Sequence, residues 1–442
     1  MRSAKLTMAK YLLLLFVACG LQIVAFSQEN SPYSRYGLGD LVPSQNITNR
    51  AMGGIAAGYS DFQSINFVNP ASLGNITNTI FDLGAEADIR TLKSLNPAKK
   101  YTQSNSLFSY LQVGFPIASK KMIKKHIGWG VSVGLRPISR IDYKIEKQER
   151  ISTIDSLTTL YEGTGGVTQA FIGTGFHTKH LNIGLDFGYM FGNKDFNTRL
   201  AFINDTVTYY KSNSGTKTHF GGLFVTGGIQ YQTELSAGTI LRIGAYGTLQ
   251  HNLKATQDIT RETFQYDANG GTYRLDSIYD QSGISGTIQY PSSFGAGFSY
   301  SGKQWLYGAD FETANWSNYR YMGQADALRN NWTIRGGVQY YPAKENTPSK
   351  KYFNFVKYRA GFYYGPDYIQ PGASRPQYAF TMGTGMPLTS LQRIRFGEYV
   401  LLNTALEIGG RGDKNSNVKE NIVRFSIGLS MNARWFVKPK YD

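Results

Sequence analysis

Histidine is the side chain in this sequence best suited to metal binding, and the chain has five: His126, His177, His180, His219 and His251. His177 and His180 have the H-x-x-H spacing that could place two ligands together on a helix. Here, however, the two residues flank an expected tight turn, and no acidic ligand stands beside them. The pattern therefore favours turn residues, and the sequence predicts neither a metal site nor a cofactor.

Carboxylates are the next candidates, because general acid–base chemistry needs a positioned pair. Asp310 and Glu312 alternate along an expected strand, so both side chains lie on one face. Nothing resembling a nucleophile or base accompanies them. We therefore predict that they face the inside of a barrel and pair with Arg335 or Arg359. The sequence predicts no enzyme, and an outer-membrane lipase or protease is the weakest hypothesis.

Two short motifs carry little information about function. Arg411-Gly412-Asp413 spells an adhesion tripeptide, but coincidence explains it better in an expected polar loop. A glycine-rich phosphate loop followed by Lys-Ser or Lys-Thr is absent from the sequence, so nucleotide binding has no support.

The elements that position these residues are β-strands. From Val423 to Val437, alternate positions are apolar and the residues between them are polar or small. Successive side chains of a strand point to opposite faces, so this segment has one lipid-compatible face and one wet face. Its length suits a tilted membrane strand of about nine to eleven residues. A soluble sandwich usually has shorter strands.

The same alternation predicts a transmembrane antiparallel β-barrel of about 14 strands. The expected strands are Ile80–Arg90, Asn105–Pro116, His126–Arg136, Val167–His177, Leu181–Gly192, Thr218–Gln232, Gly238–Gln250, Ile288–Tyr300, Gln304–Ala314, Asn331–Tyr341, Phe353–Tyr364, Pro376–Met386, Phe396–Gly409 and Asn421–Phe436.

The connections between the expected strands alternate in length. Short ones are Thr178–His180, Thr233–Ala237 and Ser301–Lys303, and long loops are expected at Pro137–Gly166, Asn193–Lys217 and His251–Thr287. Short periplasmic turns and long outer loops are typical of outer-membrane barrels. We therefore expect a Gram-negative outer-membrane protein whose even strand number returns both termini to the periplasm. A soluble propeller or sandwich is the alternative, but it predicts no such asymmetry.

Composition narrows the possible partners. The formal charge is +16, but the basic residues are spread along the chain, with short clusters at Lys120–Lys125 and Lys350–Lys351. This distribution argues against nucleic acid and favours outer-membrane lipid and lipopolysaccharide. Tyrosine and phenylalanine are abundant, as in membrane-interface belts. Cys19 is the only cysteine and precedes the expected mature chain.

Residues 1–27 resemble a signal peptide, with a basic start, an apolar run and small residues at Ala25 and Ser27. A lipoprotein signal ending at Cys19 is the alternative, but the apolar run continues beyond it. Residues 28–79 form a polar lead-in followed by an irregular, glycine-rich stretch. We expect this stretch to plug the lumen of a barrel formed by residues 80–442.

The plug prediction depends on residue types suited to close packing. Gly53 and Gly54 let the backbone approach the wall and adopt positive φ. Pro70 fixes a bend, and Asn69 can bond neighbouring backbone groups before Ala71. Whether the plug is a rigid stopper or a movable gate stays open.

At these residues the chain resembles the FadL family of outer-membrane fatty-acid and hydrocarbon transporters. The resemblance comprises Arg50–Gly54, Asn69–Ala71, Tyr290–Phe298, Gly308–Glu312 with Trp316-Ser317, and Trp332–Val338. It implies a fourteen-stranded barrel with an N-terminal hatch at Gly53, Gly54, Asn69, Pro70 and Ala71. The additional segment SPYSRYGLGD looks more like FadL-like proteins of secretion or assembly complexes.

Two functions follow as hypotheses. The first is passive uptake of small hydrophobic molecules through a FadL-like barrel. The second is a non-transporting barrel that serves as a subunit of an outer-membrane secretion or protein-assembly complex, with other envelope proteins as partners.

Overall fold

The architecture comes from a computed structural model of the chain, and it describes most of the sequence after residue 30. The described residues are 31–95, 98–117, 119–152, 154–204, 207, 209–267, 269, 271–343, 351–370, 375–389, 399–413, 416 and 418–433. The predicted signal peptide, residues 1–27, lies outside them. Among the described residues, no helix is both long and apolar enough to cross a membrane.

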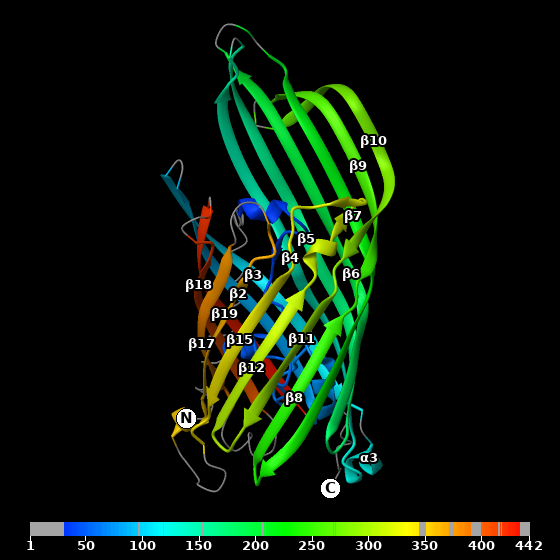
Figure 1. The fold of residues 1–442 in the computed structure, drawn as a ribbon, viewed down its shortest axis with the longest axis vertical. Helices are drawn as coiled ribbons and strands as arrows, with labels where there is room; N and C mark the ends of the chain where they lie inside the picture. The colour runs from blue at the N-terminus through cyan, green and yellow to red at the C-terminus, as the bar shows by residue number, and fades with distance from the viewer. Residues whose placement is uncertain are drawn as a thin grey trace, which may run out of the picture.

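A single antiparallel sheet closes on itself into a barrel (Figure 1). Its strands are β2 (Thr79–Leu95), β3 (Ala98–Pro116), β4 (Gly128–Arg150), β5 (Ser156–His177), β6 (Leu181–Ile203), β7 (Lys211–Ser236), β8 (Thr239–Thr248), β9 (His251–Tyr266), β10 (Thr272–Tyr290), β11 (Ser293–Ser301), β12 (Trp305–Ala314), β15 (Asn331–Tyr340), β16 (Lys357–Pro366), β17 (Pro376–Pro387), β18 (Tyr399–Arg411) and β19 (Val418–Ala433). β19 pairs with β2 and closes the ring.

These segments make fourteen barrel strands, as the sequence predicts. β8 and β9 occupy one position, because β7 pairs with β8 along one part of its length and with β9 along another. β10 and β11 likewise share a position, pairing with β9 and β8 respectively. The expected strand Ile288–Tyr300 is therefore interrupted, and Pro291 lies at the break between β10 and β11. A proline cannot donate to the strand ladder, which is consistent with a break there.

Short elements complete the described chain. They are η2 (Pro32–Arg35), β1 (Asp40–Leu41), α2 (Ile47–Arg50), η3 (Pro70–Asn75), α3 (Lys120–Lys124), η4 (Trp316–Asn318), β13 (Arg320–Tyr321), β14 (Gln324–Ala325) and η5 (Tyr352–Phe355). Two expected strand ends change as a result. His126 and Ile127 precede β4, and η5 takes the start of the strand expected at Phe353–Tyr364. Phe396 and residues 434–436 lie outside the described residues.

β6 shows how the sequence sets the height of an apolar outer belt. From Leu181 to Phe191 its outward residues are apolar and exposed, and Asp186 and Met190 point inward and are buried. Beyond Phe191 the outward positions become polar, beginning with Asn193 and Asp195. The apolar belt of this strand therefore ends at Phe191.

The prediction of three long loops is wrong. Residues 137–166, 193–217 and 251–287 are mostly strand, because β4–β7, β9 and β10 continue far beyond the belt (Figure 1). We call this six-stranded extension the tall wall and its end of the barrel the tall end. The opposite end, where β2 begins and β19 ends, is the base. The outward positions of the extension are mostly polar or mixed, so its strands lack the continuous apolar outer stripe that marks a belt strand.

Residues 31–78 run inside the barrel and touch its wall on several sides. Gly53 lies against β15 and β16, Gly58 against β8 and β11, and Gly74 against β5. β1 pairs with the edge of β4 beyond the end of its pairing with β3, with Asp40 opposite Arg140 and Leu41 opposite Ser139. We call residues 31–78 the buried segment. It lies in the lumen at the level of the belt.

Candidate functional site in the filled lumen

Two asparagines shape the buried segment. The Asn46 side chain accepts from the Asn49 backbone N–H (2.8 Å) and begins α2. The Asn69 side chain accepts from the Ala71 N–H (3.1 Å), and Pro70 takes the first position of η3. The Asn69 amide also donates to the Ala57 carbonyl at 2.7 Å. Each side chain thus satisfies backbone groups that would otherwise be buried without partners.

Gly53 and Gly54 occupy the conformation that only glycine adopts easily. Their φ angles are +67° and +85°. A Cβ on Gly53 would lie 2.5 Å from the carbonyl oxygens of Gly336 and Phe362 in the wall. The Gly53 N–H donates to the Thr381 hydroxyl at 2.8 Å. Gly53 is therefore a position of close backbone contact between the segment and the wall, and Gly54 lies against the side chains of Arg335 and Gln45.

The four residues predicted to carry lumen charges have different partners. Asp310 accepts hydrogen bonds from the Ala56 and Ala57 N–H groups at 2.5 and 2.8 Å. Glu312 and Arg335 form an ion pair at 3.2 Å. Arg359 donates to the side chains of Gln339 (2.9 Å) and Asn403 (3.0 Å). Asp310 thus holds the segment directly, and Arg335, rather than Arg359, pairs with Glu312.

A denser set of charges, which the sequence analysis missed, lies near the tall end of the lumen. Asp40 of the buried segment receives Arg90 of β2 and Arg411 of β18, each at 2.6 Å. Arg411 also lies 3.5 Å from Glu420 of β19, and Glu420 accepts from the Ser31 hydroxyl at 2.8 Å. We call Asp40, Arg90, Arg411 and Glu420 the Asp40 network. It ties the start of the segment to three strands.

A second group fixes the segment at α2. Arg50 pairs with Glu86 of β2, which also receives Arg140 of β4 at 3.0 Å. Nearby, Arg424 lies 3.1 Å from Glu407. All five side chains except Arg140 are almost fully buried. The sequence does show which polar residues lie on the inner face of a strand, because side chains alternate between its two faces. This alternation does not show which of these residues form ion pairs with one another.

Electrostatics favours the charged forms within the segment. Burial alone would raise the pKa of Asp40, but the guanidinium groups of Arg411 and Arg90 outweigh burial and hold that pKa below its usual range. The side chain of Asp61 is only 12% exposed, and although burial would raise its pKa, Lys357 at 2.8 Å holds that pKa below the usual value. Both aspartates therefore act as fixed anions that bind the segment to cations of the wall.

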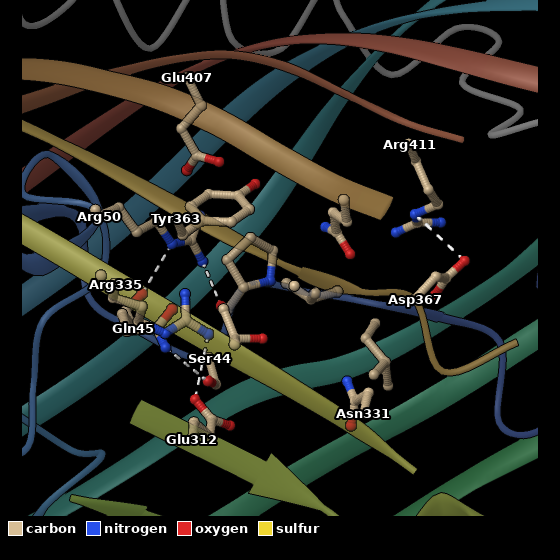
Figure 2. A pocket seen from close by; sticks show the side chains of 18 of the residues that line it. Ser44, Gln45, Arg50, Glu312, Asn331, Arg335, Tyr363, Asp367, Glu407 and Arg411 are labelled. Carbon is tan, nitrogen blue, oxygen red and sulfur yellow. Dashed lines mark hydrogen bonds and ion pairs between the residues drawn. The ribbon is translucent and has the colours of Figure 1, made fainter. Parts of the chain in front are cut away.

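Two small cavities lie between the buried segment and the wall. The first, of about 140 Å³, has charged residues of both signs on its walls, including Arg50, Arg335, Glu407 and Arg411. Figure 2 shows Arg335 with Glu312 on one side of this space and Arg411 with Asp367 on the other. The second, of about 160 Å³, is more apolar. Its lining includes Val68, Ile138, Met190, Tyr290 and Trp316.

The histidine pair does not converge on one point. His177 contacts the Asn182 side chain at 2.6 Å, and His180 contacts the Gln232 carbonyl at 3.2 Å. In the described part of the chain, no group of three His, Cys, Asp or Glu residues is arranged to hold a metal ion. Arg411 of the adhesion-like tripeptide is buried in the Asp40 network.

The chain has a FadL-like β-barrel fold. A Pseudomonas aeruginosa FadL homologue superposes with a TM-score of 0.55 at 11% identity, covering 89% of this chain and 99% of that one. The Ralstonia pickettii toluene transporter TbuX gives 0.52 at 15% identity, covering 88% and 98%. The Pseudomonas putida toluene transporter TodX gives 0.52 at 14% identity, covering 90% and 99%.

The family is shown by a separate comparison. The BamG family model matches residues 8–442, so the chain belongs to the BamG family. A search of curated proteins finds no match.

Proposed function

We propose that this protein is a non-transporting barrel that serves as a subunit of an outer-membrane protein complex, with its lumen sealed by residues 31–78. The observation that carries the proposal is the way the lumen is filled. Asp40, Arg50 and Asp61 of the buried segment pair with charged side chains of the wall. Sliding the segment aside would expose or separate these charges in a poorly solvated interior, which is costly. The family name BamG also points towards envelope-protein partners.

Passive uptake of small hydrophobic molecules is the second candidate, and the second cavity favours it. Its volume of about 160 Å³ resembles an apolar protein cavity of about 150 Å³ that binds benzene. Met190 and Trp316 give it apolar surface, but Arg136 and Glu312 also line it. The charged first cavity lies beside it and shares Glu312. Continuous passage of an apolar molecule through this region would require moving past ionised groups.

The decisive experiment compares complex formation with uptake. We expect tagged protein extracted in a gentle detergent to co-purify with other envelope proteins in fixed stoichiometry. Proteoliposomes containing the purified barrel should take up labelled toluene no faster than protein-free vesicles. A barrel that purifies alone and accelerates toluene entry would overturn the proposal in favour of uptake. A matched Asp61→Asn variant tests whether loosening the segment creates a leak.

We also propose that the base faces the periplasm, with both termini there, and that the belt contacts lipid and lipopolysaccharide. Because the predicted mature chain lacks cysteine, single cysteines can report orientation. A membrane-impermeant maleimide should label Ile278→Cys at the tall end of intact cells and spare Lys121→Cys at the base. Labelling in the opposite pattern would reverse the orientation.

A further inference from the structure

The tall wall ends in two edge strands, β10 on one side and β4 on the other. β10 pairs with β9 along its length, but its other edge pairs with β13 at Ile288 and Gln289 and accepts the Met322 N–H at the Thr287 carbonyl. Among the described residues, Thr272–Gly286 therefore have a strand partner on one side alone. β4 continues to Arg150, although its pairing with β3 ends at Leu135, and β1 pairs with it beyond that point at Ser139 and Arg140.

The two edges differ in how they are protected against pairing. In β4, five of the eight residues Tyr143–Arg150 are charged, which is a common way to block edge association. In β10, only three of the fifteen residues Thr272–Gly286 are charged. This edge instead displays Tyr273, Leu275 and Ile278, with exposed fractions of 50%, 42% and 72%. β4 is thus protected by charge, and β10 presents apolar side chains along an edge that no described strand covers between Thr272 and Gly286.

Irregular pairing limits what can fit on the β10 edge. Its register with β9 shifts between Arg274 and Asp276, between Ser277 and Tyr279, and again after Gln281. Bulges increase local twist and interrupt a ladder, so they disfavour a long, flat sheet. The edge therefore suits a short extended segment better than stacking against another broad sheet.

The polarity of the neighbouring strand argues against lipid covering this region. The outward positions of the neighbouring strand β9 are polar along most of its length: Asn252, Lys254, Thr256, Asp258, Thr260 and Glu262. Such a face belongs in water rather than in the lipid-facing belt. The exposed apolar residues of β10 thus lie where only another polypeptide or a soluble ligand can cover them.

Charge indicates the character of the occupant. Residues 258–280 of the β9–β10 hairpin contain five acidic and two basic residues, a net charge of −3. An unpaired strand edge is complemented by an extended backbone, and alternate side chains of the added strand provide specificity. We propose that the free edge of β10 docks a short extended segment of a partner protein that combines apolar residues with Lys or Arg. This inference rests on the proposed role as a complex subunit and names its binding surface.

The direct test uses defined peptides and the full-length barrel in detergent. The first probe is a nonapeptide in which Val alternates with polar residues, three of them Lys and the others Thr. The matched probe replaces each lysine with glutamate. We expect the lysine peptide to bind at least tenfold more tightly. The double substitution Leu275→Lys/Ile278→Lys should abolish this difference, because it gives the edge the charge protection of β4. Ile203→Lys, at the end of the interior strand β6, should leave binding unchanged.

A cellular experiment separates this inference from the proposed function. A photo-cross-linking amino acid at Ile278 should capture a partner segment containing apolar and basic residues, at least tenfold more efficiently than one at Ile203. If partners co-purify with both wild type and the double variant, and Ile278 captures none, the edge is not the docking surface. If wild-type protein purifies alone, the subunit role itself fails. Capture of a second copy of this chain would show that the edge mediates self-association and does not bind a different partner protein.

Discussion

Two ion pairs of equal length show how differently the lumen and the tall wall use charge. Arg411 and Asp40 lie 2.6 Å apart in the lumen, with side chains only 4% and 6% exposed. Arg274 and Glu262 are also 2.6 Å apart, but on the tall wall, where their side chains are 45% and 18% exposed. Their distances cannot distinguish the two pairs. Burial does, because it determines what remains when one partner is lost.

In the lumen, the charged groups are desolvated by burial, so they are stabilised by their protein partners rather than by water. Removing one partner leaves an uncompensated buried charge, which costs about 3–5 kcal/mol. On the tall wall, water replaces a lost partner, and exposed pairs contribute about 0–1 kcal/mol. We conclude that lumen charges hold the buried segment in place, and that tall-wall charges mainly keep the extension soluble.

Replacing Arg411 with methionine should have the largest effect. Arg90 would still lie beside Asp40, but Asp40, Glu420 and Asp367 would all lose a cation that they share, so buried negative charge would exceed positive charge there. We therefore expect the free energy of unfolding to fall by about 3–5 kcal/mol. Urea titration of the protein in detergent micelles measures this change. Arg274→Met is the matched control, with an expected loss below about 1 kcal/mol. Equal losses in the two variants would contradict the distinction between lumen and tall wall.

A pair of glycine substitutions sharpens the comparison through packing. Gly53 and Gly283 have similar φ angles, +67° and +72°, but only Gly53 is crowded by backbone atoms. Around Gly283, an added Cβ would meet nothing within 4 Å. Gly283→Ala should therefore cost only the backbone strain, about 1–2 kcal/mol.

Gly53→Ala adds a clash to the same strain, since its Cβ would lie 2.5 Å from two carbonyl oxygens of the wall. Overpacking typically adds about 1–3 kcal/mol. The same urea titration gives both values, and hydrogen exchange of residues 47–60 shows whether the segment has loosened. A Gly53 variant no less stable than the Gly283 variant would mean that the segment adjusts freely within the lumen.

The belt could be predicted from sequence because a continuous apolar outer face imposes a strict alternation. Within Leu181–Phe191 the outward apolar residues alternate with inward residues that are mostly polar or small, and such belts give the strand number and the antiparallel barrel. The tall wall could not be predicted in the same way. Asn193–Ile203 has water on at least one side and mixed residue types on both, so no period of two marks it as strand.

The candidate site divides similarly. Gly53, Gly54 and Asn69 are visible in sequence because turn chemistry and positive φ restrict residue type locally. The Asp40 network is not visible, because Asp40 and Arg411 are 371 residues apart in the chain. Arg411 appears in sequence only as part of a tripeptide expected in a loop. Barrel closure brings it next to Asp40, and closure is a property of the whole sheet.

Lowering the pH should reduce the stabilisation from the Asp40 ion pairs step by step, as the carboxylate becomes protonated. The folded-state pKa of Asp40 lies below its unfolded value, so its contribution is complete above about pH 4. That contribution is lost as the pH falls towards the folded-state pKa. We expect the urea midpoint of wild type to decline between pH 5 and pH 3 by more than that of Asp40→Asn. Parallel declines would assign the acid sensitivity to other carboxylates.

The smallest predicted effect is the coupling between Arg274 and Glu262. A double-mutant cycle with Arg274→Met and Glu262→Gln should give an interaction energy of about 0.2–1 kcal/mol, because both groups keep contact with water. Raising the salt concentration to about 1 M shortens the screening length to about 3 Å and should remove most of this energy. The corresponding cycle for Arg411 and Asp40 should change much less with salt, because ions cannot approach a buried pair. Salt dependence would thus separate the two pairs even though their interatomic distances are the same.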